Sequence, residues 1–326
     1  MKSSLDLLII GAGPAGLSCA IEAGKTGLNY LVVDKGNVVD SIQHFQRDMY
    51  FFSTPELLEI GDLPFVVPTV RPTSLDCVNY YRRVADHFNI SLRPFDRVVA
   101  VARADSHFEI DCASGHHVSA TAVVVATGYY DCPNRLGIPG EDLPHVTHYY
   151  SDPLPFYRRN VIIIGGKNSA VEAALDLYRH GAHVSLVHRG KAPSEGVKYW
   201  ILPDFENRVR EGSVKAFFNC NVREFKPYTT IISDHSGTTS DIPTDSAFVL
   251  IGYRPDTSFL RMCGIDIDPG TLAPLHDPGT METNVSGIFV AGGIAGGRLT
   301  NKIFIENGRG HGKLIVKKFC ETYRRR

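Results

Sequence analysis

The fold is decided by the stretch Leu5-Asp6-Leu7-Leu8-Ile9-Ile10-Gly11-Ala12-Gly13-Pro14-Ala15-Gly16-Leu17. An apolar run of strand length is followed by a G-x-G-x-x-G turn and by a helical pattern that begins at Pro14. Gly11 allows the tight turn, Gly13 lets a pyrophosphate approach the backbone, and Gly16 lets the helix pack closely on the strand. The helix start presents unpaired N–H groups and a positive dipole end, and Pro14 has no N–H to leave unpaired. The stretch therefore predicts a dinucleotide site.

An acidic residue ends the next predicted strand, Tyr30-Leu31-Val32-Val33-Asp34. Asp34 follows Gly11 by about twenty residues, the separation at which a carboxylate accepts hydrogen bonds from an adenosine ribose. The alternative is a solvated strand end that Lys35 neutralises. The glycine turn and the acid together favour an adenine-dinucleotide site.

The composition is that of a soluble globular protein long enough for two domains. Of the 326 residues, 43% are hydrophobic, and the formal net charge is −1. A near-neutral chain offers no electrostatic footprint for nucleic acid, and the basic end Arg324-Arg325-Arg326 is too short to indicate a binding arm. No apolar run approaches the length of a membrane span. The apolar start leads directly into the glycine turn, which favours a strand over a signal peptide.

The seven cysteines are scattered, odd in number and without C-x-x-C spacing: Cys19, Cys77, Cys112, Cys132, Cys220, Cys263 and Cys320. This pattern argues against a disulfide framework, a zinc site and a redox pair of neighbouring cysteines. A reducing, cytoplasmic location fits best.

After the first two predicted strands, the hydrophobic pattern becomes irregular. Residues 43–68 are rich in aromatic side chains, which either wall a flavin ring or fill a hydrophobic gap. A helix is predicted from Ser74, as its cap, to Phe88. Three short strands are predicted over 96–102, 107–112 and 117–118.

A continuous apolar run, Ala122-Val123-Val124-Val125-Ala126-Thr127-Gly128, predicts a parallel strand buried on both faces. Thr127 and Gly128 let the backbone pass close to a cofactor. The proline-rich segment 129–155 then marks a linker. Further along, the sequence predicts a helix or loop over 199–210, strands over 213–232, 247–252 and 287–293, and a helical end over 303–319.

The opening pattern repeats in Arg159-Asn160-Val161-Ile162-Ile163-Ile164-Gly165-Gly166-Lys167-Asn168-Ser169-Ala170, where Lys167 replaces the second glycine and Gly166 offers the close backbone approach. The following strand, His183-Val184-Ser185-Leu186-Val187, ends in His188-Arg189 without an acid. An arginine there suits a 2′-phosphate, and a charge-assisted contact is worth about 1.5–3 kcal/mol, which predicts a preference for NADPH over NADH. Lys191 adds to this basic pocket. The alternative for Arg189 is an ordinary surface arginine.

Two dinucleotide units in one chain, the first interrupted by the second, predict an α/β protein with two Rossmann-like domains. A discontinuous FAD-binding domain is expected over 1–130 and 254–326. An inserted NADPH-binding domain is expected over 131–253. One domain then holds a permanently bound flavin and the other an exchangeable nicotinamide.

Several motifs together resemble the two-dinucleotide-binding flavoproteins of the low-molecular-weight thioredoxin reductase family, over essentially the whole chain. Longer strings resemble the bacillithiol disulfide reductase (YpdA-like) branch: Phe51-Phe52-Ser53-Thr54, Leu58-Glu59-Ile60-Gly61-Asp62, Gly165-Gly166-Lys167-Asn168-Ser169-Ala170 and Ile303-Phe304-Ile305-Glu306-Asn307-Gly308. The resemblance implies a cytoplasmic FAD enzyme that uses NADPH and forms a homodimer or homotetramer. Lys167 is then a feature of the branch.

Three residue patterns depart from the family. The Cys-x-x-Cys pair of thioredoxin reductases is missing, which argues against a dithiol relay to thioredoxin. Gly293 stands where an acid usually contacts the flavin ribityl chain, as in the closer branch. Ala15 stands where the branch has a cysteine, which puts the disulfide substrate in question while both cofactor sites stay intact.

The expected contacts follow from the motifs and the resemblance. FAD is expected to contact Gly11, Gly13, Pro14, Ala15, Gly16, Asp34, Lys35, Ser41, Val99, Ala126, Thr127, Gly128, Gly293 and Ile303. NADP is expected to contact Gly165, Gly166, Lys167, Asn168, Ser169, Ala170, His188, Arg189 and Lys191. No side chain is expected to act as a covalent catalyst, because hydride passes from nicotinamide to flavin.

The predicted function is an NADPH-dependent FAD oxidoreductase that reduces a small acceptor, with a low-molecular-weight disulfide as one candidate. Two alternatives remain open. A ferredoxin- or flavodoxin-linked NADP reductase would also lack the cysteines, but it would need a basic docking face. A redox-sensing module would retain FAD without turnover.

Overall fold

The computed structural model describes residues 5–300 and 302–324, and the chain splits into two compact units. Unit 1 consists of Met1–Gln43, Tyr50–Cys132 and Tyr253–Arg326, and unit 2 of His44–Met49 and Pro133–Gly252. Two short strands lie where the chain passes between the units, β7 (Cys132–Pro133) and β16 (Tyr253–Arg254), and they pair with each other. The second unit is thus an insertion in the first.

The predicted domain boundaries differ from these units at a few residues. Residues 131, 132 and 253 belong to the first unit, and the segment 44–49 belongs to the second. The reason for the second difference is local, because Arg47 N–H donates to the Ser151 carbonyl oxygen over 2.9 Å. The assignment of FAD to unit 1 and of NADPH to unit 2 stays a prediction.

Unit 1 is built on a seven-stranded sheet with the order β3-β2-β1-β6-β5-β4, in which β17 also pairs with β6. The strands β3, β2, β1, β6 and β17 are parallel, whereas β4 and β5 form the antiparallel edge. Their bounds are β1 Leu5–Ile10, β2 Tyr30–Val33, β3 Leu92–Arg93, β4 Val98–Ala104, β5 His107–Cys112, β6 His117–Val125 and β17 Ile288–Val290. The strands predicted over 117–118 and from Ala122 are one element, β6. It pairs with β5 in its first half and with β17 in its second half.

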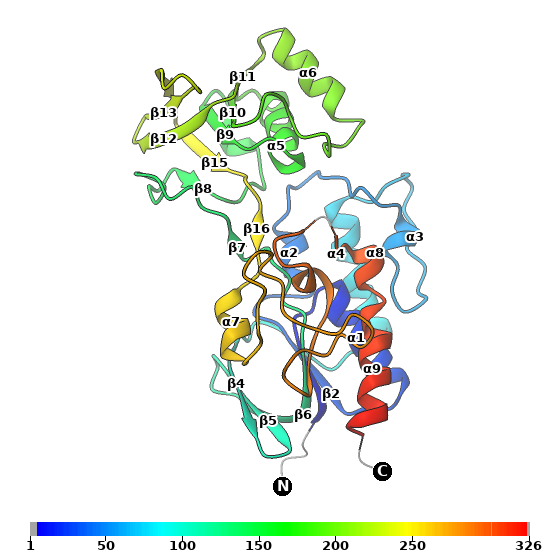
Figure 1. Cartoon of the computed structure of the whole chain (residues 1–326). Helices are drawn as coiled ribbons and strands as arrows, with labels where there is room; N and C mark the ends of the chain where they lie inside the picture. Colours follow the sequence, from blue (N-terminus) through cyan, green and yellow to red (C-terminus); the bar gives the residue numbers. More distant parts are fainter. Residues whose placement is uncertain (1–4, 301, 325–326) are drawn as a thin grey trace. The chain divides into compact units, whose positions relative to one another are not determined.

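Helices α1 and α9 pack against each other beside this sheet (Figure 1). They approach closely, since a Cβ on Gly312 would lie 2.9 Å from the backbone N of Cys19. The helices of unit 1 are α1 Pro14–Lys25, α2 Asp40–Gln43, α3 Pro55–Leu58, α4 Ser74–His87, α7 Thr257–Met262, α8 Ile305–Gly308 and α9 His311–Thr322, with a 3-10 turn over Gly292–Gly296. The prediction of a single helix over 303–319 is wrong, because the helical hydrogen-bond pattern is interrupted at Arg309 and Gly310, which form a turn between α8 and α9.

The start of α4 corrects a second prediction. The cap is Thr73 and not Ser74, because Thr73 Oγ1 accepts from Asp76 N–H over 3.1 Å. Asp76 Oδ2 in turn accepts from Thr73 N–H over 2.9 Å, which completes a capping box. Ser74 is buried as the first helical residue.

Unit 2 has a five-stranded parallel sheet with the order β11-β10-β9-β15-β8 and a separate three-stranded antiparallel sheet, β12-β13-β14. The parallel strands are β8 Val146–Thr147, β9 Asn160–Ile164, β10 His183–His188, β11 Val214–Phe218 and β15 Ser246–Val249. The antiparallel strands are β12 Asn221–Lys226, β13 Thr229–Ser233 and β14 Thr239–Pro243, and the helical elements are α5 Asn168–Arg179, α6 Leu202–Arg210 and a 3-10 turn over Leu154–Phe156. β14 was not predicted, because its sequence Thr-Ser-Asp-Ile-Pro has no apolar alternation.

Within residues 5–300 and 302–324, none of the helices has both the length and the apolar character needed to cross a membrane. The same residues contain no cluster of His, Cys, Asp and Glu side chains arranged to hold a metal ion.

Candidate functional site

The first glycine turn joins β1 to α1 at the carboxyl end of the unit 1 sheet. Gly11 has φ +114°, and a Cβ there would lie 2.5 Å from the Ala126 carbonyl oxygen. A Cβ on Gly16 would lie 1.9 Å from the Gly11 carbonyl oxygen. Both positions therefore require glycine, Gly11 for its conformation and Gly16 for the contact of helix with turn.

Gly13 and Pro14 begin helix α1 and leave its first turn open. Gly13 is the N-cap without a side-chain hydrogen bond, and Pro14 is the first helical residue. A Cβ on Gly13 would meet no atom of this chain within 4 Å. The space that Gly13 leaves at the positive end of the helix fits the pyrophosphate of a dinucleotide.

Asp34 follows β2 and binds the glycine turn directly. Its Oδ2 accepts from Ala12 N–H over 2.6 Å, and its Oδ1 accepts from Gly36 N–H over 2.8 Å. Burial raises the pKa of Asp34, and the two N–H groups oppose that rise. A carboxylate has about four acceptor sites, so two remain for ribose hydroxyls.

The Lys35 ammonium is directed to other carboxylates. Its Nζ lies 2.7 Å from Asp131 Oδ1 and 3.7 Å from Asp40 Oδ2. The pair with Asp131 joins the end of β2 to the segment before β7, and the Lys35 charge also opposes the rise in the pKa of Asp34 as the smallest of its causes. An FAD contact of Lys35 stays a prediction.

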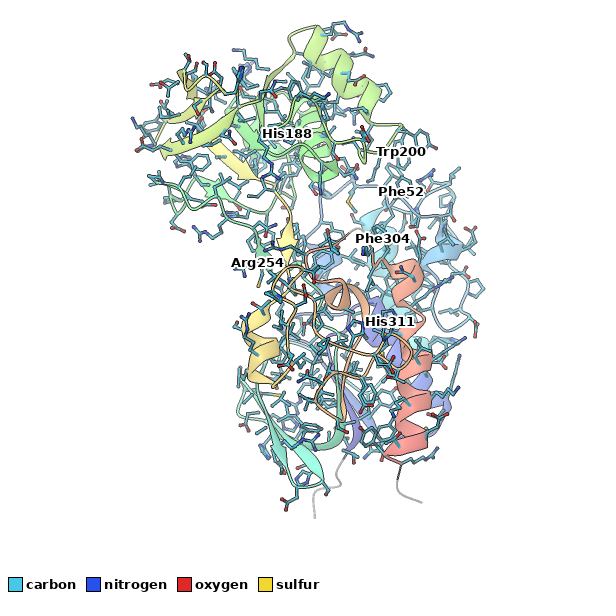
Figure 2. All side chains as sticks on the ribbon, in the orientation of Figure 1. Phe52, His188, Trp200, Arg254, Phe304 and His311 are labelled. Carbon is cyan, nitrogen blue, oxygen red and sulfur yellow. The ribbon has the colours of Figure 1, made fainter. Side chains whose placement is uncertain are left out.

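Position 15 faces the turn that follows β17. A Cβ on Gly292 would lie 2.6 Å from the Ala15 Cβ, and Gly292 has φ +73°. Gly292 N–H donates to His311 Nδ1 over 3.1 Å. An Nδ1 that accepts is unprotonated, and burial, with a smaller effect of His276, lowers the pKa of His311 in the same sense. The His311 side chain lies at the start of α9 (Figure 2).

The remaining predicted FAD residues lie on several elements of unit 1. Ala126, Thr127 and Gly128 follow β6, and Gly293 follows β17, where a Cβ would lie 2.8 Å from the Tyr129 ring. Ser41 lies in α2, Ile303 precedes α8, and Val99 lies in β4. The start of this edge strand is close to Asp34, since Asp96 N–H donates to the Asp34 carbonyl oxygen over 2.9 Å.

Two sequence strings that carry the branch resemblance are joined in space. Ser53 Oγ donates to the Glu306 carboxylate. Arg309 Nη1 donates to the carbonyl oxygens of Glu56, over 2.9 Å, and Glu59, over 2.6 Å. Sequence reasoning missed Arg309, because no local pattern connects it with residues about 250 positions earlier.

The aromatic segment around residue 50 fills part of the core and leaves other rings exposed. Phe65 is buried and stacks on Tyr80 with ring centroids 4.2 Å apart, so it fills the core. Phe52, labelled in Figure 2, is 59% exposed, and the Arg71 guanidinium lies 5.9 Å from the centroid of its ring. Its part in walling a flavin stays a prediction.

The second glycine turn joins β9 to α5 at the carboxyl end of the unit 2 sheet. Gly165 has φ +149°, and a Cβ there would lie 2.5 Å from the Leu250 carbonyl oxygen. Gly166 is covered by the His188 ring, which a Cβ would approach to 2.5 Å. Lys167 is the exposed N-cap of α5. A side chain at position 166 would therefore clash with His188, which explains the glycine independently of the predicted approach of the coenzyme.

The predicted NADP residues in the first turn of α5 differ in their exposure and in their contacts. Ser169 is exposed and Ala170 is buried. The Asn168 side chain donates from Nδ2 to the Gly196 carbonyl oxygen over 3.0 Å and accepts at Oδ1 from Lys198 N–H over 2.8 Å. Its amide is therefore bound to the loop after β10.

Two cations lie just beyond β10. Arg189 and Lys191 are both exposed, and neither forms an ion pair within the described part of the chain. His188, labelled in Figure 2, ends the strand, and burial, helped by the Arg189 charge, lowers its pKa. Uncompensated cations beside a glycine turn are a suitable arrangement for a phosphate.

The pattern of two glycine turns agrees with the comparisons with known proteins. The model of the pyridine nucleotide-disulphide oxidoreductase family matches residues 8–292. The chain belongs to this family. It is 42% identical to the bacilliredoxin reductase Bdr of Bacillus subtilis, over 96% of this chain and 97% of that protein. Identity to a ferredoxin–NADP reductase of Ignicoccus hospitalis is 27%, over 89% of this chain and 90% of that protein.

A solved structure supports the same family. The bacillithiol disulfide reductase Bdr (YpdA) from Bacillus cereus has a TM-score of 0.95 and 40% identity, covering 98% of this chain and 99% of that chain. The predicted resemblance, the two-domain Rossmann fold, the oxidoreductase class and the cofactor pair of FAD and NADPH are confirmed at this level. The individual contact residues stay predictions.

Proposed function

We propose that this pyridine nucleotide-disulphide oxidoreductase carries electrons from NADPH through FAD to a low-molecular-weight thiol disulfide. The observation that carries the proposal is a pair of glycine turns, each at the carboxyl end of its own parallel sheet, in a chain 42% identical to a bacilliredoxin reductase. The overall reaction is NADPH + H⁺ + RSSR → NADP⁺ + 2 RSH, so one hydride and one proton reduce one disulfide bond.

FAD binds to unit 1 in this proposal. The open first turn of α1 holds the pyrophosphate, and Asp34 binds the adenosine ribose while it keeps Ala12 in place. When bound, FAD accepts a hydride from the nicotinamide and makes both electrons available to the acceptor. The protein contributes binding and orientation, and no side chain forms a covalent bond in the reduction of the flavin.

NADPH binds to unit 2. The turn at Gly165 and the start of α5 receive the pyrophosphate, and the exposed Arg189 and Lys191 receive the 2′-phosphate. The His188 ring packs against Gly166 and supports the turn between them. A charge-assisted contact of this kind is worth about 1.5–3 kcal/mol, which corresponds to a preference for NADPH of about tenfold to a hundredfold.

The cysteines of this chain support electron transfer directly from flavin to the acceptor. Cys19 is fully buried, and its burial raises the pKa of the thiol to about 12. Burial also raises the pKa of Cys132. A redox-active thiol needs access and a low pKa, so neither residue suits a relay. Ala15, which stands where the resembling branch has cysteine, provides none either.

A second candidate function is a ferredoxin- or flavodoxin-linked NADP reductase. The 27% identity to a ferredoxin–NADP reductase over most of both chains favours it. The net charge of −1 opposes it, because acidic electron carriers are usually steered by a basic face. The third possibility, a redox-sensing module, would bind FAD and NADPH without turnover.

The acceptor distinguishes these functions. The purified protein is reduced with NADPH without oxygen, and its flavin absorbance is followed after addition of bacillithiol disulfide, glutathione disulfide, ferredoxin or flavodoxin. Rapid reoxidation by a small disulfide supports the proposal. Reoxidation only by ferredoxin or flavodoxin supports the second candidate, and no reoxidation by any acceptor supports a sensing module.

Location and assembly belong to the same proposal. We place the protein in the cytoplasm, where thiols stay reduced, on the basis of its scattered free cysteines. A homodimer or homotetramer, without nucleic acid or membrane as partner, is the assembly that the family resemblance favours. Size-exclusion chromatography with light scattering measures the assembly.

A further inference from the structure

The loop that follows β10 is attached to the second glycine turn at both ends of its basic part. At the start, the His188 ring lies between two glycines, because a Cβ on Gly166 would lie 2.5 Å from the ring and a Cβ on Gly190 would lie 2.7 Å from Nε2. At the end, Ser194 N–H donates to the Gly166 carbonyl oxygen over 2.7 Å. The stretch 189–193, which contains both cations of the basic pocket, is thus held at each end by the same residue of the turn.

Asn168 attaches the next part of this loop to helix α5. Its Nδ2 donates to the Gly196 carbonyl oxygen and its Oδ1 accepts from Lys198 N–H, over 3.0 and 2.8 Å. A single amide therefore binds one carbonyl and one N–H of the loop, as a backbone partner would. The first turn of α5 and the loop are held together by a side chain that sequence reasoning assigned to the coenzyme.

A buried ion pair strengthens the same attachment. Lys198 is 6% exposed and Glu172 is 8% exposed, and the Lys198 ammonium donates to the Glu172 carboxylate. Burial raises the pKa of Glu172, and the Lys198 charge opposes the rise. Because Glu172 lies one turn after Asn168 on α5, both contacts fix Lys198 to one helix.

We propose that Asn168 is a positioning residue for coenzyme selection. It holds the segment 194–198 on α5 and thereby fixes the preceding basic loop, so that Arg189 and Lys191 are in place before the 2′-phosphate arrives. A preformed loop loses less conformational freedom on binding, and the affinity for the phosphate rises accordingly. The inference rests on the proposed binding of NADPH to unit 2.

The test measures binding of two fragments to the FAD-loaded protein by titration calorimetry. The fragment 2′,5′-ADP contains the 2′-phosphate, and 5′-AMP lacks it. Asn168→Ala is expected to weaken 2′,5′-ADP binding by about fivefold or more and to change 5′-AMP binding by less than about twofold. In turnover, the KM for NADPH rises by a similar factor, and it rises more than the KM for NADH does. Asn168→Ser replaces this variant if Asn168→Ala does not fold.

Asn160→Ala is the matched control. Asn160 also donates from its side chain, to Asp245 Oδ2 over 3.2 Å, but it lies at the amino end of β9, away from the turn. Its replacement should lower the melting temperature and leave the ratio of the two fragment affinities within about twofold. Equal weakening of both fragments by Asn168→Ala, or no weakening of either, overturns the inference.

Arg189→Ala separates this inference from the proposal beneath it. If Arg189→Ala leaves the ratio of fragment affinities unchanged, the proposed 2′-phosphate site is wrong, and the role of Asn168 falls with it. If Arg189→Ala lowers the ratio while Asn168→Ala does not, the coenzyme site stands and the positioning role alone is wrong.

Discussion

Asp34 illustrates how one carboxylate serves both the fold and the proposed cofactor site. It accepts hydrogen bonds from Ala12 and Gly36 and retains acceptor sites for a ribose. We expect Asp34→Ala to lower FAD affinity by about tenfold to a hundredfold, because hydrogen bonds to a charged group are lost at the ribose and at the turn. The ratio of bound flavin to protein after purification measures this.

Asp6→Ala is the control for that experiment. The Asp6 carboxylate also accepts from a backbone N–H, that of Asn29 over 2.9 Å, but it lies at the start of β1. It should leave flavin occupancy unchanged. The assignment of Asp34 would be wrong if both variants retained the flavin of the parent.

Arg189 is the residue on which, in our proposal, the preference for NADPH depends. Arg189→Ala should raise the KM for NADPH by about tenfold and leave that for NADH nearly unchanged, because only NADPH carries the 2′-phosphate. Arg179→Ala, which removes an exposed arginine paired with Asp204, is the control. Equal changes for both coenzymes would show that Arg189 does not contact the 2′-phosphate.

Variants of Cys19 and Cys132 test the prediction that no thiol of this chain carries the electrons. We expect Cys19→Ala, Cys132→Ala and the double variant to oxidise NADPH with the preferred acceptor within about threefold of the parent. Cys19→Ala also lowers stability by about 1 kcal/mol, because it removes a buried atom. A loss of about a hundredfold in turnover, with flavin reduction by NADPH preserved, would establish a thiol relay instead.

At the scale of elements, the hairpin of β5 and β6 contains a network whose strength depends on pH. His117 Nδ1 lies 2.7 Å from Asp111 Oδ1, and His107 Nε2 lies 2.6 Å from Glu109 Oε1. Hydrogen bonds to Asp111 and Glu109 raise the pKa of His117, and those from Ser119 and the two histidines lower the pKa of Glu109.

The sign of the pH effect follows from these two shifts. The contribution of His117 is complete below its unfolded pKa of about 6.5 and is lost as pH rises through the raised folded value. The contribution of Glu109 is complete above about pH 4.5 and is lost as pH falls through its lowered value. His117→Ala should therefore lower the melting temperature most near about pH 6 and hardly at all near about pH 9. His183→Ala, at an exposed position on β10, should show no such difference.

The elements also show what a sequence can and cannot predict. The structural roles of Gly11 and Gly16 were predictable, because strand, turn and helix lie within one short pattern, whereas the ribose contact of Asp34 stays a prediction. The contacts of Arg309 with α3 and of Asn168 with the loop after β10 were not, because they join residues that are distant in sequence and have no periodic signal. The late helical segment was predicted as one helix, since no apolar period marks the turn before His311.

At the scale of the whole molecule, two compact units each supply one glycine turn, and the chain crosses between them at β7 and β16. In the proposed function, the first unit binds FAD, the second binds NADPH, and the flavin passes the electrons to the acceptor. The net charge of −1 favours a small acceptor over a docked acidic protein.

The most direct measurement of the central claim is the number of thiols formed for each NADPH consumed. The purified protein is given limiting NADPH and excess bacillithiol disulfide without oxygen, and free thiol is titrated. The reaction NADPH + H⁺ + RSSR → NADP⁺ + 2 RSH predicts two thiols for each NADPH, at an unchanged ratio in the Cys19→Ala/Cys132→Ala variant. Bleaching of the flavin by NADPH without any thiol formed would contradict the account.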